Sequence, residues 1–203
     1  MRSPTRRESN VTPDKQSEGL LFVSKHFLDW IERRGQELRC RLSLEPTAAL
    51  NPYKLAQTME VRVVSPLDIL ELAPCLLDQL LVQDSDSWSG GTLLLPNGKT
   101  IVVLNPNHSE TRKRATLMEE LAHVFLGHTP SSLIVFKNRT AMRSCKKSQE
   151  TQAYGVGAAA LVPMKLLQHA QSNLTAREKL AHYCGVSVDL VTFREKVTGV
   201  KLG

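Results

Sequence analysis

One short segment of the chain, RATLMEELAHVFLGH at 114–128, holds residues whose types and spacing could bind a metal ion and move a proton. Glu119 and His123 are four residues apart, so on a helix their side chains would be neighbours on one face. The two ligands of an H-E-x-x-H helix have this spacing, and the glutamate after the first ligand acts as a general base. Here Glu119 stands at the first ligand position and Glu120 at the base position. The pattern alone is weak, because glutamate and histidine also line the solvated face of ordinary amphipathic helices.

His128 adds a second histidine next to this pattern. It lies five residues beyond His123, which is about 140° around an ideal helix, so it cannot share that face if the helix continues. A helix that ended at Gly127 would allow the chain to turn back. His128 is therefore a candidate alternative ligand.

Two predicted elements must position these residues. Apolar and β-branched residues flank an Asn-Gly pair over 92–104, and this pattern predicts a tight hairpin. The following segment predicts a helix over 110–126, capped by Ser109 or Asn107 and ended by Gly127.

The remaining elements are predicted from periodicity and turn residues. They are, in chain order, a helix at 20–38, a short helix that begins at Asn51-Pro52, a strand at 61–64, a helix at 70–82, an edge strand at 133–136, a basic loop at 137–148, a long alanine-rich helix at 150–170, and two short helices at about 175–183 and 187–197. Because helices predominate and the sheet is small, we expect an α+β fold.

The chain has 203 residues, of which 41% are hydrophobic, as expected of one globular domain with appendages. No apolar run approaches the ~18 residues of a membrane span, and the polar N-terminus lacks the apolar core of a secretory signal. Four cysteines without a C-x-x-C pair are expected to be reduced thiols of a cytoplasmic protein. The formal net charge of +6 allows an acidic partner such as nucleic acid, but no run of lysine and arginine requires one.

The stretch from Trp88 to His128 resembles the ImmA/IrrE family of metallo-endopeptidases. It contains W-S-G-G, a hairpin that ends in I-V-V-L-N-P, and R-x-R-A-T-L-M-E-E-L-A-H-x-x-L-G-H. The family's usual core is R-x-T-L-x-H-E-L-x-H-x-x-L-G-H, from which this chain departs at Glu119. A second block, E-T-Q-A-Y-G-V-G-A-A-A-L-V-P at 150–163, is similar to a family helix whose leading glutamate is the third zinc ligand. The segment at 51–64 also resembles the family's short helix and strand, so the resemblance covers about 50–165.

This resemblance implies a zincin-like metallopeptidase domain, with a small twisted sheet, an active-site helix and a second helix that bears a ligand. It implies that Glu119, His123 and Glu150 are the metal ligands, with His128 as the alternative ligand, and that Glu120 is the catalytic base. Zinc would be the cofactor. Manganese or iron is the alternative, because a second carboxylate favours harder ions. If Glu119 is instead solvated or paired with a basic neighbour, the chain would bind no metal.

The resemblance further implies a cytoplasmic metallo-endopeptidase, a hydrolase that cleaves a peptide bond in a protein partner such as a helix-turn-helix transcriptional repressor. The alternative is a catalytically inactive family member that acts as a protein- or DNA-binding regulator. No membrane partner is expected. We expect a flexible tail at 1–18, the ImmA/IrrE-like zincin domain with its N-terminal helix at 19–170, and a C-terminal helical pair at 171–203.

The helical pair has the spacing of a helix-turn-helix, with a small residue, a turn glycine and a branched residue over 181–191. In that interpretation the second helix would offer Thr192, Arg194 and Lys196 to DNA. We favour a helical pair docked on the zincin domain, because Asp189 would face phosphates and no third helix supports the pair.

Much of the basic excess lies in Arg112-Lys113-Arg114 and in the loop at 137–147. Both segments flank the carboxylates of Glu119, Glu120 and Glu150 in the predicted arrangement. We therefore expect these cations to offset the clustered negative charge, and DNA to be a less favoured partner.

Overall fold

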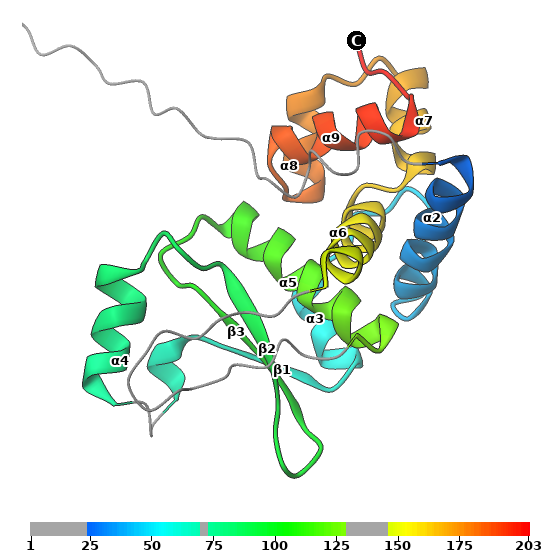
Figure 1. Ribbon diagram of the computed structural model, residues 1–203. Helices are drawn as coiled ribbons and strands as arrows, with labels where there is room; N and C mark the ends of the chain where they lie inside the picture. Colours follow the sequence, from blue (N-terminus) through cyan, green and yellow to red (C-terminus); the bar gives the residue numbers. More distant parts are fainter. Residues whose placement is uncertain (1–23, 70–72, 129–145) are drawn as a thin grey trace, which may run out of the picture.

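Helices surround a small sheet in the computed structural model, which describes residues 24–69, 73–128 and 146–203 (Figure 1). The helices are α2 (Lys25–Cys40), α3 (Pro52–Thr58), α4 (Pro74–Asp78), α5 (Glu110–Leu126), α6 (Lys147–Leu161), α7 (Met164–Ser172), α8 (Arg177–Cys184) and α9 (Val188–Thr198), with a 3-10 turn η1 (Pro66–Asp68) and a π-helical turn η2 (Gln79–Gln83). The strands are β1 (Val61–Val64), β2 (Gly90–Leu94) and β3 (Thr100–Leu104). The predicted α+β fold is confirmed. The tail at 1–18, the strand at 133–136 and most of the basic loop lie outside the described residues.

The sheet has the order β1-β3-β2, in which β1 runs parallel to β3 and β2 runs antiparallel to it. β2 and β3 form the predicted hairpin. At its turn the N–H of Leu95 donates to the carbonyl of Lys99 at 2.9 Å, and Gly98 has a φ of +79°. Because only glycine adopts such a φ without steric cost, the Asn-Gly pair explains where the chain reverses. The short helix α3 precedes β1 and is capped as predicted, since the Asn51 side chain accepts from the N–H of Tyr53 at 3.0 Å.

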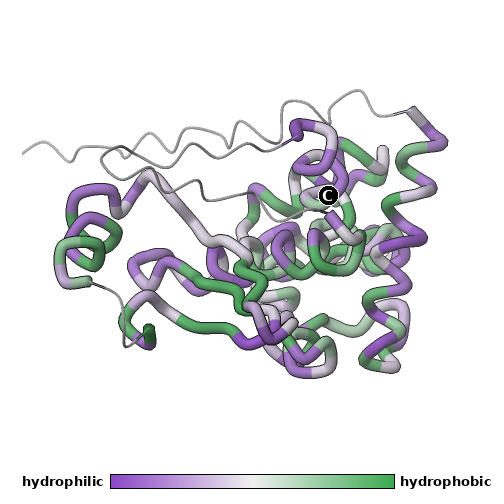
Figure 2. The backbone as a smooth tube through the Cα atoms, turned by 60° about the horizontal axis from the view of Figure 1, so that its bottom comes forward, coloured by the Kyte–Doolittle hydropathy of each residue, from purple (hydrophilic) through white to green (hydrophobic). Residues whose placement is uncertain are grey.

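Helix α5 lies against the strands, and α6 lies between α5 and α2 (Figure 1). Hydrophobic and hydrophilic residues alternate along the helices in Figure 2, as expected when each helix buries one face. The segment 155–161 of α6 is buried and made mostly of small residues. A Cβ at Gly157 would lie only 3.2 Å from the carbonyl oxygen of Met118 in α5. This close contact sets where α6 lies along α5.

The long helix predicted at 150–170 is wrong, because the structure has two helices there. α6 ends at Leu161 and α7 begins at Met164. Pro163 lies between them, and a proline in a helix lacks the N–H donor and clashes with the carbonyl four residues earlier. The N–H of Met164 instead donates to the carboxylate of Glu32 in α2 at 3.1 Å. α6 also begins at Lys147, slightly before the predicted start.

The C-terminal helices are joined to the rest of the fold through α9, which contacts α6 and α7. Arg194 of α9 has no exposed surface; its Nε donates to the carbonyl of Val162 at 2.9 Å, and its guanidinium pairs with Glu32. Arg194 is therefore not available to DNA, and this part of the helix-turn-helix interpretation is wrong. The positive charge of Arg194 instead pairs with the Glu32 carboxylate inside the fold. Lys196 is exposed.

None of the helices in the described ranges is both long and apolar enough to cross a membrane. The cysteines that the structure describes, Cys40, Cys75 and Cys184, are free thiols. Burial raises the pKa of the Cys184 thiol to about 12, so this thiol stays protonated at neutral pH.

Candidate metal centre

Helix α5 carries three of the predicted site residues. Its N-terminus is capped by Ser109, one of the two predicted caps. Its apolar face packs against the sheet and against α6, and this face includes the buried residues Leu117, Met118, Leu121 and Ala122. Glu119, Glu120 and His123 are half-buried at the margin of this face. The packing of α5 therefore holds Glu119 and His123 near α6 and holds Glu120 beside the hairpin.

Helix α6 brings Glu150 to the same place from another part of the chain. Glu150 lies in the first turn of α6, and its Oε1 is 3.6 Å from Nε2 of His123. One carboxylate oxygen each from Glu119 and Glu150 and one ring nitrogen of His123 all lie within 4.8 Å of one another. In the described parts of the chain, no other three His, Cys, Asp or Glu side chains are arranged in this way. The structure thus brings the three predicted ligands together.

The donors and their spacing fit a divalent metal ion. A tetrahedral zinc ion bound to oxygen and nitrogen at about 2.0–2.2 Å holds its ligand atoms about 3.3–3.6 Å apart. The 3.6 Å between Nε2 of His123 and Oε1 of Glu150 is at the upper end of this range. The other ligand pairs lie within 4.8 Å, so small side-chain movements would bring all three atoms around one ion. Two carboxylates formally neutralise the charge of a divalent ion, and their oxygens also suit manganese or ferrous iron. The side chains of His123 and Glu150 are 16% and 21% exposed, so the cluster is accessible from solvent without lying on the open surface.

Glu120, the predicted base, is held by Thr92 of β2, a residue that sequence reasoning missed. The Thr92 hydroxyl donates to Oε2 of Glu120 at 2.6 Å. Thr92 pairs with Val102 in the hairpin register, and the hairpin packs on α5. The only signal in the sequence was one polar residue at the start of the apolar run T-L-L-L, which is too common to indicate a site.

His128 lies beside the cluster. α5 ends before Gly127, whose φ of +66° turns the chain back, so the N–H of His128 donates to the carbonyl of His123 at 3.0 Å. The Nδ1 atoms of the two rings are 3.1 Å apart, and Nε2 of His128 is 3.0 Å from Oε1 of Gln152 in α6. Burial and the neighbouring His123 ring lower the pKa of His128, despite the hydrogen bond to Gln152 and the charge of Glu150. Both ring nitrogens of His128 therefore have partners already: Nδ1 contacts His123 of the cluster, and Nε2 contacts Gln152 outside it.

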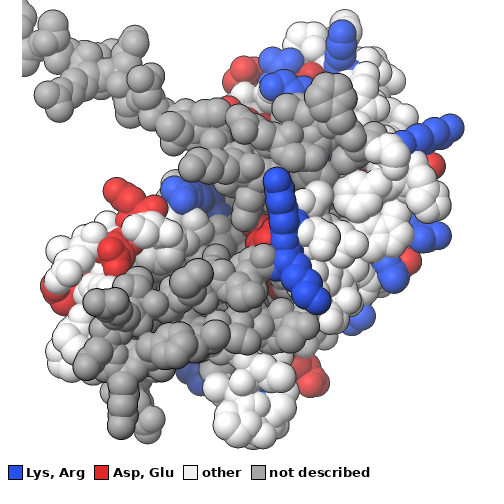
Figure 3. Space-filling model, in the orientation of Figure 1, with Lys and Arg blue, Asp and Glu red and all other residues white. Residues whose placement is uncertain are grey.

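The basic residues at the start of α5 do not surround the carboxylates as predicted. Arg112, Lys113 and Arg114 contact, in that order, the Ser89 hydroxyl at 2.9 Å, the Glu110 carboxylate at 3.0 Å and the Leu50 carbonyl at 2.9 Å. Arg112 and Arg114 thus fix the start of α5 to neighbouring segments, whereas Lys113 pairs within the helix. On the face shown in Figure 3, one short run of blue lies beside a red patch near the middle, and the other described lysines and arginines are scattered. This face therefore gives no support to the DNA interpretation.

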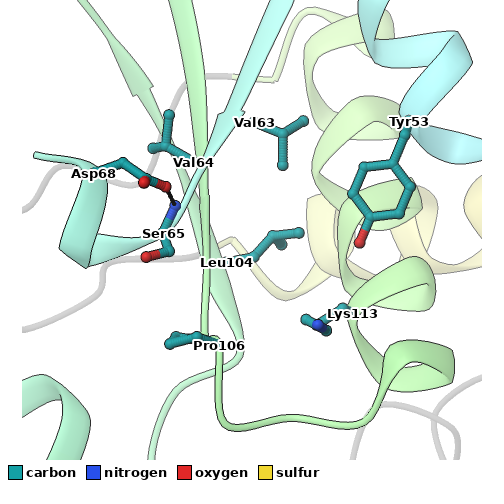
Figure 4. Close-up of a pocket in the computed structure, with 8 residues that line it drawn as sticks. All are labelled: Tyr53, Val63, Val64, Ser65, Asp68, Leu104, Pro106 and Lys113. Carbon is teal, nitrogen blue, oxygen red and sulfur yellow. Dashed lines mark hydrogen bonds between the residues drawn. The ribbon is translucent and has the colours of Figure 1, made fainter.

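A separate cavity of about 190 Å³ lies between β1, the end of β3 and the start of α5 (Figure 4). Tyr53, Asp68 and Lys113 are among its lining residues, and the cluster residues are not. Asp68 accepts a hydrogen bond from the N–H of Ser65 at 2.7 Å. Burial raises the pKa of Tyr53 to about 12, and its hydrogen bond to Glu110 adds to the effect. Tyr53 thus stays protonated at neutral pH and cannot act as a base there.

The domain combines a small sheet with a helix that carries the pattern E-E-x-x-H, and a glutamate from a second helix lies next to that pattern. This arrangement is typical of a metallopeptidase-like α+β domain. Residues 79–196 match the family model described as the IrrE N-terminal-like domain, Peptidase M78. The match covers more than half of the chain and runs from η2 into α9, so the chain belongs to this family. The family predicted from the motifs is therefore confirmed. No curated protein matches the chain.

Proposed function

We propose that the chain binds a divalent metal ion through Glu119, His123 and Glu150 and hydrolyses a peptide bond in a protein partner. The observation that best supports this function is the approach of three ligand atoms to within 4.8 Å of one another, from two separate helices. Membership of a metallopeptidase family supports it independently. Zinc is the proposed ion, and manganese or ferrous iron is the alternative, because Glu119 adds a second carboxylate. The family resemblance suggests a cytoplasmic transcriptional repressor as the partner.

In this function Glu120 moves the proton. A bound divalent ion would act as a Lewis acid that polarises the scissile carbonyl. Glu120 takes a proton from the attacking water and then delivers it to the leaving amine. The hydrogen bond from Thr92 restricts the rotation of the Glu120 carboxylate, so that its position is fixed before substrate arrives.

Metal analysis of the purified full-length chain, grown with zinc and manganese, tests the metal site. We expect about one equivalent of metal per chain, since the three candidate ligands form a single site. His123→Ala should lose the metal, whereas His182→Ala, which removes an exposed histidine of α8, should keep it. Equal metal contents in the wild type and His123→Ala would contradict the proposed site.

Restoring a histidine at position 119 tests the chemistry. A site with two histidines and one carboxylate carries less negative charge, so the ion polarises the reacting groups more strongly. Glu119→His should therefore raise peptidase activity against a candidate repressor, and a further Glu120→Gln change should abolish that activity while the metal is kept. If Glu119→His is inert but the chain binds the repressor, the non-catalytic regulator is the correct function.

A further inference from the structure

His128 and Gln152 form a chain of hydrogen bonds that ends on the only histidine of the metal cluster. Oε1 of Gln152 is 3.0 Å from Nε2 of His128, and Nδ1 of His128 is 3.1 Å from Nδ1 of His123. The two rings meet edge to face, with centroids 5.0 Å apart and an interplanar angle of 73°. The chain of contacts therefore approaches His123 from the side opposite to the nitrogen that faces Glu150.

The protons in this chain can be assigned from the hydrogen-bonding capacity of each group. An amide oxygen can only accept, so the proton between Gln152 and His128 belongs to Nε2 of His128. A neutral imidazole carries one proton, so Nδ1 of His128 is an acceptor. The proton between the two rings therefore belongs to Nδ1 of His123. A neutral His123 then has no proton on Nε2, the atom that lies 3.6 Å from Glu150.

We propose that His128 and Gln152 are positioning residues that hold His123 in the tautomer protonated on Nδ1, in which Nε2 can bind a metal ion. This inference rests on the proposed metal site. A histidine in water favours the opposite tautomer, whose Nε2 proton must be removed before that nitrogen can bind a metal. The hydrogen bond made by one ring nitrogen sets the state of the other. The protein thus selects the competent tautomer before the metal arrives.

The backbone explains why this chain of contacts forms. Gly127 in the left-handed conformation turns His128 back toward the helix that it has just left. Gln152 lies two residues after Glu150 on α6. One helix therefore contributes a candidate ligand and also sets the tautomer of another ligand. A change at Gln152 should thus be detected at His123, although the two residues belong to different helices.

The tautomer of His123 can be measured in the metal-free full-length chain by long-range proton–nitrogen correlation NMR of the imidazole rings near neutral pH. A His123→Gln variant assigns the signals. We expect the wild type to carry its proton on Nδ1. Gln152→Leu removes the acceptor and should return His123 to the Nε2 tautomer. Gln152→Glu supplies a carboxylate that can only accept, so it should keep the Nδ1 tautomer.

Zinc affinity, measured by competition with a chromophoric chelator, is the second readout. Gln152→Leu and His128→Phe should weaken zinc binding about 10- to 100-fold, the usual effect of removing the outer partner of a ligating histidine. Gln152→Glu should bind zinc as the wild type does. Gln168→Leu is the matched control, because it makes the same change at an exposed position of α7, and it should alter neither readout.

The two readouts separate failure of this inference from failure of the proposed function. A wild-type His123 protonated on Nε2 would overturn the inference, and so would a Gln152→Leu variant with unchanged tautomer and zinc affinity. A wild type that has the Nδ1 tautomer but binds neither zinc nor manganese would instead refute the metal site.

Discussion

Gly157 of α6 allows a direct test of how the cluster is assembled, because α6 meets the backbone of α5 at this residue. A Cβ at Gly157 would lie 3.2 Å from the carbonyl oxygen of Met118 and 3.3 Å from the nitrogen of Glu119, whereas ordinary contact begins at 3.4 Å. Neither backbone atom can rotate aside, so Gly157→Ala must move the two helices apart. Because Glu119 lies on α5 and Glu150 on α6, this movement separates two of the candidate ligands.

Gly155, on the same helix, is the matched control for this substitution. A Cβ at Gly155 would lie 3.2 Å from Cγ2 of Ile31, which is a side-chain atom and can adjust more easily. Replacing a helical glycine by alanine gains about 1 kcal/mol of helix propensity at either position. Overpacking against a rigid neighbour costs about 1–3 kcal/mol. We therefore expect Gly155→Ala to be close to neutral or stabilising, and Gly157→Ala to be about 1–2 kcal/mol less stable than Gly155→Ala.

Urea unfolding of the metal-free proteins measures the free energy of unfolding, and chelator competition measures zinc affinity. Gly157→Ala should bind zinc at least about tenfold more weakly than Gly155→Ala, because ligands must be held to within a fraction of an ångström. Equal zinc affinities and equal unfolding midpoints in the two variants would show that the approach of α5 to α6 does not set the spacing of the ligands.

Two further predictions follow from single hydrogen bonds. Thr92→Val removes the hydroxyl that fixes Glu120, so peptidase activity should fall about 10- to 100-fold with metal content unchanged; a simultaneous loss of metal would contradict this role. The hydrogen bond from Arg177 holds the pKa of the Glu195 carboxyl below its ordinary value, against the opposing effect of burial. Glu195 therefore stabilises the fold above the unfolded-state pKa of about 4.3, and this contribution is lost as the pH falls through the folded-state pKa. The stability difference between the wild type and Glu195→Gln, measured by urea unfolding, should be present at neutral pH and disappear in acid; a difference independent of pH would refute the assignment.

The elements that could be predicted from the sequence are those whose boundaries depend on nearby residues. The helix at 110–126 agrees with α5 because Ser109 caps its start and Gly127 ends it with a φ of +66°. Such signals act within one turn of the helix, so tertiary structure is not needed to read them. The same reasoning explains the agreement for α3, whose cap and first helical residue, Asn51 and Pro52, are adjacent in the chain.

Arg194 shows why other features could not be predicted. Its charge and its place on a short C-terminal helix indicate an exposed residue, yet it is fully buried. Its carboxylate partner, Glu32, lies 162 residues earlier in the chain, and its other acceptor is the carbonyl of Val162, which is left without a helical donor where Pro163 separates α6 from α7. A buried charge is tolerated only when such partners are present, and no local pattern reveals them.

The candidate site likewise contains residues that local sequence patterns predict and residues that only the tertiary structure reveals. The four-residue spacing of Glu119 and His123 determines their shared helix face, whereas Thr92 and Gln152 reach the site only because β2 and α6 pack on α5. His128 depends on both kinds of information. Its five-residue spacing from His123 excludes it from the face of a continuous helix, and the left-handed Gly127 brings it back. The turn at Gly127 can be predicted from the sequence. Gln152, the acceptor that fixes the proton position on His128, cannot be predicted, because it comes from a different helix.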